Sequence, residues 1–175
     1  MAIAETDILY KLSGGTTNTS PAASLGLAMS TQGGGIITKT KTFNSIFDDI
    51  SGAEALAGDV EYRCIYVHNN HGSLTLTSAK VWIETNTANA KDMIDIGLDL
   101  AGKNGTADDI ADESTAPSPA VTFGHACTSY ATGLSLGDMA FSEKYAIWIR
   151  RTITADMTAD DDEWFTLKTQ GDTAA

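Results

Sequence analysis

The sequence has 175 residues, of which 42% are hydrophobic, and its 23 acidic and 11 basic side chains give a formal net charge of −12. This length suits one domain with a sizeable core, because domains usually span roughly 100–200 residues. The acidic balance argues against direct nucleic-acid binding, since such a surface repels phosphate backbones. Apolar runs are only a few residues long, so no membrane span is expected.

The N-terminal region differs in composition from the rest of the chain. Its first segment, "MAIAETDILYKL", lacks the pattern of a secretory signal, which predicts folding in a cytoplasm. From Leu12 to Gly35 the chain is mostly Gly, Ser, Thr, Ala and Asn, and a structureless loop of this length is uncommon inside a compact domain. We therefore expect residues 1–42 to form an extended N-terminal arm, disordered or held from outside the core, and residues 43–175 to form the folded domain.

From Phe43 onward, apolar and polar residues alternate between clusters of Gly, Asn, Asp and Pro, which is typical of an antiparallel β protein. The clearest example is "DMIDIGLDL". Its isoleucine and leucine side chains, up to Leu100, are expected to face the core, and Asp95 and Asp99 to face water. The segment "EYRCIYVHN" is partly apolar on both faces, which predicts a strand in the middle of a sheet.

The turn at Asn69–Gly72 predicts a hairpin between that strand and "SLTLTSAKVWIET". Apolar positions on either side of Ser78–Ala79 are out of phase, so a bulge is expected there. One short helix of about two turns is predicted in "FDDISGAEALAGD", capped by Asp or Ser and ended by Gly58. Six or more short strands and few helices predict an all-β, antiparallel β-sandwich, either immunoglobulin-like or jelly-roll.

Candidate catalytic groups are sparse. The histidines, His68, His71 and His125, have no cysteine or carboxylate at ligand spacing, and no nucleophile elbow or P-loop is present. Acidic loops at 107–113 and 159–163 could bind Ca²⁺ if they met, but without EF-hand spacing we expect solvated loops. The sequence thus predicts a protein that is not an enzyme and has no cofactor and no metal.

Two other residue pairs bear on the chain's contacts. Cys64 and Cys127 are expected to be buried free thiols, because the chain is expected to fold in a reducing compartment. Arg150 and Arg151 are adjacent in a predicted strand and so point to opposite faces. Either both pair with acids of their own subunit, or one reaches an acidic neighbour in an assembly. Trp148 lies opposite the strand's isoleucines, either on the outer face or under the N-terminal segment, and an exposed Trp beside Arg is a common interface pairing.

Four segments carry a resemblance to a known family. They are "FDDISGAEALAGDVEYRCIYVHNNHGSLTLTSAKVWIE", "STAPSPAVTF", "LSLGDMAFSEKYAIWIRRT" and the terminal "GDT". They cover roughly Ile46 to Thr173, and the most specific pieces are "AGDVEYRCIYV" and "YAIWIRRT". In these segments the chain resembles small virion structural proteins of tailed bacteriophages and prophages.

The resemblance implies a non-enzymatic β-sandwich that is assembled in the host bacterial cytoplasm and located in the virion. It would be a capsid decoration (cement) protein that binds and stabilises the shell of the major capsid protein, acting as a dimer or trimer. The arm would then lie across neighbouring subunits, with "DILYKL" adding a strand to another sheet. The residues expected at such an interface are Ile8, Leu9, Tyr10, Leu12, Trp148, Arg150 and Arg151.

Two alternatives remain open at this point. The same sandwich could be a tail or baseplate component that contacts other virion proteins. From a different class, it could be an immunoglobulin-like module for carbohydrate or host-surface binding, with Trp82, Trp148 or Tyr66 as stacking platforms.

Overall fold

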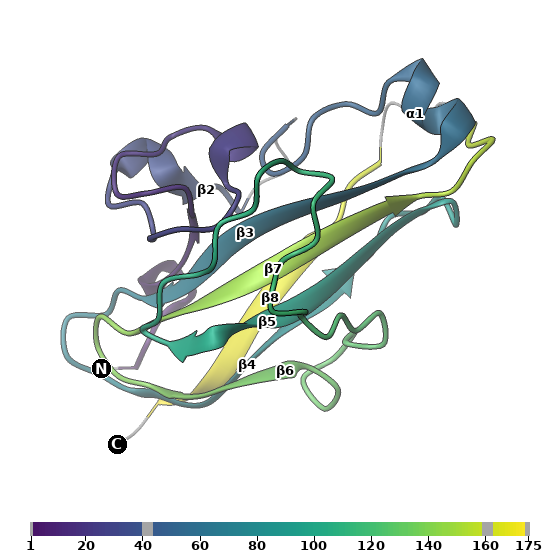
Figure 1. The fold of residues 1–175 in the computed structure, drawn as a ribbon. Helices are drawn as coiled ribbons and strands as arrows, with labels where there is room; N and C mark the ends of the chain where they lie inside the picture. Colours follow the sequence, from purple (N-terminus) through teal and green to yellow (C-terminus); the bar gives the residue numbers. More distant parts are fainter. Residues whose placement is uncertain (1, 40–43, 159–162, 174–175) are drawn as a thin grey trace.

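The structure, a computed structural model, describes residues 2–39, 44–158 and 163–173 and consists of two antiparallel sheets packed face to face (Figure 1). The five-stranded sheet has the order β2-β1-β3-β7-β5, and the three-stranded sheet has the order β6-β4-β8. The strands are β1 (Ile8–Leu12), β2 (Ile36–Ile37), β3 (Asp59–Asn69), β4 (Leu76–Thr85), β5 (Asp92–Lys103), β6 (Leu134–Met139), β7 (Lys144–Ile153) and β8 (Thr166–Thr173). The predicted all-β, antiparallel β-sandwich is confirmed, whereas the expected boundary between residues 42 and 43 lies outside the described residues.

The main core lies between the two sheets. Ile65 of β3 and Ile147 and Ile149 of β7 face Val81 and Ile83 of β4, and all five are buried to at least 99%. These side chains alternate along their strands, as the period of two in the sequence predicts. Both sheets therefore contribute one apolar face to a shared interior.

A second apolar cluster covers the outer face of the five-stranded sheet. Tyr66 of β3 and Trp148 of β7 are fully buried there. Leu25 and Met29 of the N-terminal segment pack against them. Residues of the long connection between β5 and β6 also pack there, and this connection crosses in front of the sheet in Figure 1. The middle of the sheet is covered on both faces, which confirms the predicted position of the "EYRCIYVHN" strand.

The predicted helix is present as α1 (Gly52–Ala57). The Ser51 hydroxyl accepts a hydrogen bond from the Glu54 amide, and the Glu54 carboxylate accepts one from the Ser51 amide, which makes a capping box. Gly58 ends the helix with a φ of +79°, in the left-handed region that favours glycine. Single 3₁₀ turns are η1 (Glu5–Asp7), η2 (Pro21–Ala23) and η3 (Gly33–Gly35). No helix in the described parts of the chain is long and apolar enough to cross a membrane.

The predicted hairpin after Asn69 is wrong. Strands β3 and β4 belong to different sheets, so the turn at Asn69–Gly72 carries the chain from one sheet to the other. The Asn69 side chain stabilises this crossing by donating to the carbonyls of Leu74 and Met139. The predicted bulge in β4 is confirmed, since Ser78 has a φ of +52° and the register with β6 shifts on either side of Ala79.

The polar face of β5 is not in water as expected. Asp95 is 3% exposed and Asp99 is 4% exposed, because the connection from β5 to β6 covers them. Leu100, expected in the core, is 62% exposed, and the register between β5 and β7 shifts between Leu98 and Lys103. An irregularity in β5 thus turns Leu100 outward before pairing with β7 resumes at Lys103, opposite Tyr145.

The expected extended arm also differs from the structure. Strand β1 pairs with Ile65–Asn69 of β3 in the same chain, with Leu12 opposite Ile65. Its inward side chains, Ile8 and Tyr10, belong to the main core. β1 therefore completes its own sheet and is an integral part of the domain.

The polar stretch from Leu12 to Gly35 is folded onto the outer face of that sheet. The Cys64 amide of β3 donates to the Ser24 carbonyl at 2.7 Å, and the Tyr66 hydroxyl donates to the Leu27 carbonyl at 2.7 Å. Both bonds are accepted by backbone carbonyls of the segment and need no apolar side chains there, which is why a segment of small residues is held without an apolar pattern.

Candidate functional site

Most of the side chains predicted at an interface are used inside the chain. Those buried are Ile8, Tyr10, Leu12, Trp148 and Arg151. Leu9 and Arg150 are partly exposed. Trp148 lies on the outer face of the sheet, as its alternation predicts, but it is covered, and its indole Nε1 donates to Asp99 at 2.8 Å.

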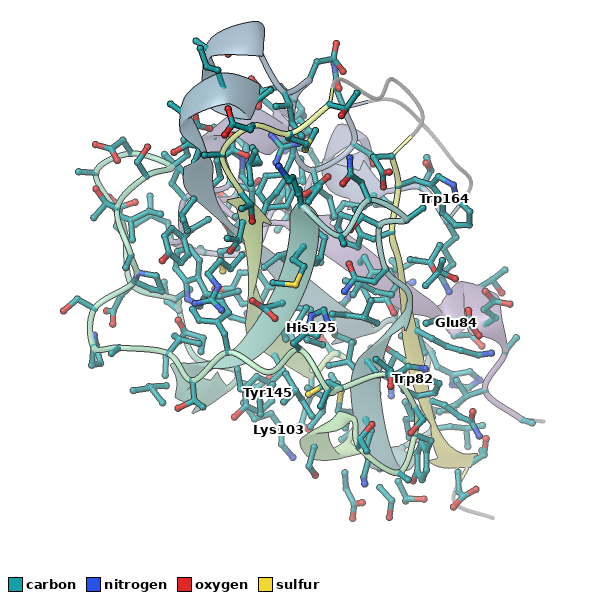
Figure 2. The ribbon with its side chains drawn as sticks, turned by 90° about the vertical axis from the view of Figure 1, so that its right-hand side faces the viewer. Trp82, Glu84, Lys103, His125, Tyr145 and Trp164 are labelled. Atoms are coloured by element: carbon teal, nitrogen blue, oxygen red, sulfur yellow. The ribbon has the colours of Figure 1, made fainter. Side chains whose placement is uncertain are left out.

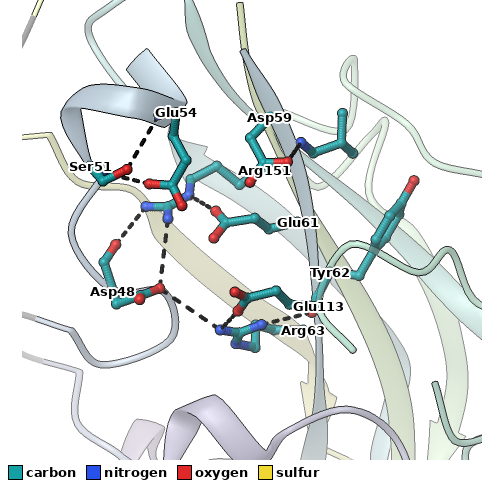
Figure 3. A network of polar contacts seen from close by, with 10 residues as sticks. Asp48, Ser51, Glu54, Asp59, Glu61, Tyr62, Arg63, Glu113 and Arg151 are labelled. Carbon is teal, nitrogen blue, oxygen red and sulfur yellow. Dashed lines mark hydrogen bonds and ion pairs between the residues drawn. The ribbon is translucent and has the colours of Figure 1, made fainter. Parts of the chain in front are cut away.

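A network of charged side chains lies at the α1 end of the sandwich and is shown in Figure 3. Its centre is Glu61 of β3, which is opposite Arg151 of β7 and accepts a hydrogen bond from the Arg151 Nε. Arg151 also donates from Nη1 to the Asp48 carbonyl at 2.9 Å. Because Glu61 and Arg151 both point inward from neighbouring strands, the sheet itself fixes their geometry.

A second arginine extends this network. Arg63 is 1% exposed, pairs with the Glu113 carboxylate and lies 3.9 Å from the Asp48 carboxylate. The Phe47 ring lies beside both guanidinium groups, with its centroid 5.6 Å from Arg63 and 4.8 Å from Arg151. Planar guanidinium groups stack well on aromatic rings, so Phe47 shields both charges from water.

Burial and charge act in opposite directions on this network. Burial raises the pKa of Glu61, while the hydrogen bond and the charge of Arg151 lower it. Carboxylate oxygens of Asp48, Glu61 and Glu113 lie within 4.8 Å of one another, a spacing that a cation could use. Two arginines already neutralise these acids, which favours an internal ion network.

The first of the two acidic loops, both expected to be solvated, is partly buried, and the second is only partly described. The first loop, 107–113, places Ala107 and Ile110 in the outer-face cluster and Glu113 beside Arg63. Residues 159–162 of the second loop lie outside the described residues.

The cavities beside this network are small. One of about 210 Å³ is lined by the side chains of Phe47, Asp48 and Arg63 and by Pro21 and its neighbours. The next, of about 190 Å³, lies beside it under Ile36 and Ile37. Both are smaller than the roughly 300–1,000 Å³ of typical small-molecule sites.

Arg150 forms a separate site on the outer face. Its Nη2 lies 2.5 Å from the Asp95 carboxylate, and its guanidinium carbon lies 4.8 Å from the centre of the Phe123 ring. His125, labelled in Figure 2, contacts the other Asp95 oxygen at 3.3 Å. Both arginines thus pair with acids of their own chain, as the first of the two accounts expects.

The other histidines have structural surroundings. The His71 Nδ1 accepts hydrogen bonds from the amides of Ser73 and Leu74 and so shapes the crossing between the sheets. His68 is 8% exposed on the outer face of the five-stranded sheet. Cys64 and Cys127 are buried free thiols, as predicted.

The residues proposed as glycan-stacking platforms are buried. Trp82 is 5% exposed beneath the edge of the Tyr130 ring, and Tyr66 and Trp148 have no exposed surface. Trp164, at the surface in Figure 2, is 43% exposed. A carbohydrate site on the three predicted aromatics would need the segments that cover the outer faces of the two sheets to move away.

The sequence-based prediction omits Glu61, Arg63 and Asp48, which form the ion network. The sequence does indicate that Glu61 and Arg63 face inward, because they alternate onto the same face as Ile65 and Val67 of the same strand. Charged residues at inward positions require partners nearby. Their partners, however, come from loops whose placement the pattern does not define.

Comparisons with known proteins identify no relative. No protein-family model matches the chain, and no curated protein or solved structure gives a significant match.

Proposed function

We propose that this chain is a non-enzymatic structural protein of a bacteriophage particle, and that within the particle it decorates the capsid and stabilises the shell of the major capsid protein. The observation that carries the proposal is the resemblance in "AGDVEYRCIYV" and "YAIWIRRT". These segments form β3 and β7, which pair from Asp59–Ile153 to His68–Lys144 in the centre of the five-stranded sheet. The most specific pieces of the resemblance are therefore the two central strands of the five-stranded sheet.

The cavities and the surface support a role in assembly. The two cavities that the described residues form beside the ion network are small, which suits a protein that contacts flat surfaces of other proteins. Large apolar side chains stand exposed at several points, among them Leu56 (69%), Leu100 (62%) and Phe141 (52%). Exposed apolar groups are candidates for contacts with partner subunits. The net charge of −12 suits a position outside a DNA-filled shell.

The composition of purified particles tests this proposal. Cryo-electron microscopy or quantitative mass spectrometry should find hundreds of copies of the chain on the shell. Shells from a deletion strain should lose resistance to heat and regain it when the purified chain is added. A few to a few dozen copies would favour a tail or baseplate position, and absence from the particle would overturn both virion roles.

A further inference from the structure

Three basic side chains lie together on the outer face of the five-stranded sheet. His68 of β3 is directly opposite Lys144 of β7. On its other side, His68 faces Leu9 of β1, and Lys11 lies two positions further along β1 on the same face. Directly opposite and diagonal cross-strand neighbours are close enough for long side chains to meet. We call Lys11, His68 and Lys144 the basic cluster.

Two members of the basic cluster are largely buried, and within the described residues the His68 ring is hydrogen-bonded to the backbone of Ser142 and not to an acid. Lys11 and His68 are each 8% exposed. The Nδ1 of His68 is fully buried and has no hydrogen-bond partner among the described residues. None of the three side chains has an acidic partner in the described part of the chain, although acids outnumber bases by about two to one in the sequence. A lysine side chain that is largely buried without an acidic partner is uncommon, because taking its charge out of water is costly.

The acids near this end of the sheet are already engaged. Asp7 accepts from the Ala4 amide, and Asp99 accepts from Trp148 and from the Ala101 amide. Glu143, next to Lys144, accepts from the Ala140 amide and pairs with Lys103 at 3.4 Å. The positive charge of the basic cluster is therefore left uncompensated within the fold.

We propose that the basic cluster binds a single oxyanion, a carboxylate or a phosphate group, held by the Lys11 and Lys144 ammonium groups and by an N–H of His68. Such an anion supplies the acceptor that His68 Nδ1 lacks and the negative charge that the two lysines lack. The ligand is the same chemical group whether it comes from an acidic side chain of a partner protein or from free phosphate.

The pKa of His68 gives a direct measure of anion binding. Burial lowers the pKa of His68, and the charges of Lys11 and Lys144 lower it further. The negative charge of a bound anion opposes the effect of the two lysines, so binding raises the pKa of His68. His71 and His125 are internal controls, because one accepts backbone hydrogen bonds and the other is paired with Asp95.

The experiment is an NMR titration of the three imidazoles in the intact chain, with chloride replaced by inorganic phosphate or by acetate at constant ionic strength. We expect a saturable shift of His68 alone and a rise in its pKa. Lys11→Met or Lys144→Met should each weaken the apparent affinity about tenfold, and Lys11→Arg should retain binding. Lys168→Met makes the same charge change in the other sheet, where Lys168 pairs with Glu84, and should leave the titration unchanged.

Saturation with both probes would define a general oxyanion site. Saturation with acetate alone would identify a carboxylate ligand, and with phosphate alone a phosphate ligand. The proposal is overturned if all three histidines shift together, if no shift saturates, or if Lys11→Met and Lys168→Met behave alike.

Discussion

Glu61 and Arg151 lie opposite each other on the two central strands and form an ion pair in the interior of the sandwich, although 90 residues separate them in the sequence. Glu61 is 1% exposed and Arg151 is 7% exposed. Neither side chain can regain contact with water unless the sheet opens. Loss of one partner therefore leaves the other as an unpaired buried charge.

Arg151→Met should lower the free energy of unfolding by about 3–5 kcal/mol, because it leaves the Glu61 carboxylate unpaired. The double variant Glu61→Leu/Arg151→Met should recover much of this loss, since it buries no charge. Urea denaturation of the three proteins measures both effects. Lys168→Met, which breaks the exposed pair with Glu84, should leave the midpoint nearly unchanged; an equal loss in Lys168→Met and Arg151→Met would contradict the prediction.

Asp92→Asn should stabilise the protein at neutral pH. Asp92 is 3% exposed, one of its carboxylate oxygens has no partner among the described residues, and burial raises its pKa to about 6. The folded state therefore binds this proton more tightly than the unfolded state does, so ionised Asp92 destabilises the fold above pH 6. The penalty is relieved as the pH falls through 6 and is absent below the unfolded pKa of about 4.

The gain from Asp92→Asn should be about 1–3 kcal/mol at pH 7 and should vanish near pH 4. Thermal or urea unfolding from pH 4 to pH 8 measures it. A constant difference between the two proteins over this range would show that titration of Asp92 is not its cause.

Gly97→Ala should detach the connection between β5 and β6 from the sheet. A Cβ at Gly97 would lie 2.4 Å from a methyl carbon of Val121 and 2.7 Å from the Thr122 carbonyl oxygen, so the connection must shift. We expect a loss of about 1–3 kcal/mol and faster proteolysis of residues 120–127. Gly72→Ala is the matched control, because no atom lies within 4 Å of the added carbon. If Gly72→Ala loses as much stability as Gly97→Ala, the close contact of the Gly97 position with Val121 and Thr122 is not the reason for the loss.

Tyr66→Phe should loosen two segments at once. The Tyr66 hydroxyl donates to the Leu27 carbonyl at 2.7 Å and accepts from the Ala107 amide at 2.9 Å. Its removal should cost about 1–3 kcal/mol and speed hydrogen exchange at Leu27 and Ala107. Tyr62→Phe, whose hydroxyl has no hydrogen bond among the described residues, should change neither. Unaltered exchange at Ala107 in Tyr66→Phe would refute this role.

The strands were accessible to prediction because side chains alternate along a strand and the apolar face is buried. The same logic places the bulge at Ser78, since only an extra residue keeps the apolar side chains on both sides of it inward. The capping residues Ser51 and Gly58 act within one turn of helix, so their effect can also be read locally.

The pairing of strands could not be predicted in the same way. The turn after Asn69 would close a hairpin as readily as it carries the chain to the second sheet, and contacts of Asn69 with Leu74 and Met139 decide between the two. Asp95 and Asp99 look like solvent positions until a remote connection covers them. The ion network likewise depends on loops that bring Asp48 and Glu113 to the arginines.

The order of strands in the five-stranded sheet also has a kinetic consequence. Strand β7 lies between β3 and β5, yet it begins only at Lys144, so during synthesis on the ribosome β3 and β5 have no shared partner until late. Their inward apolar side chains and their open edges stay exposed for that time. A topology with such distant pairing folds slowly. The chain should therefore complete its sandwich only after β7 and β8 have been synthesised, and until then it depends most on chaperones to avoid aggregation.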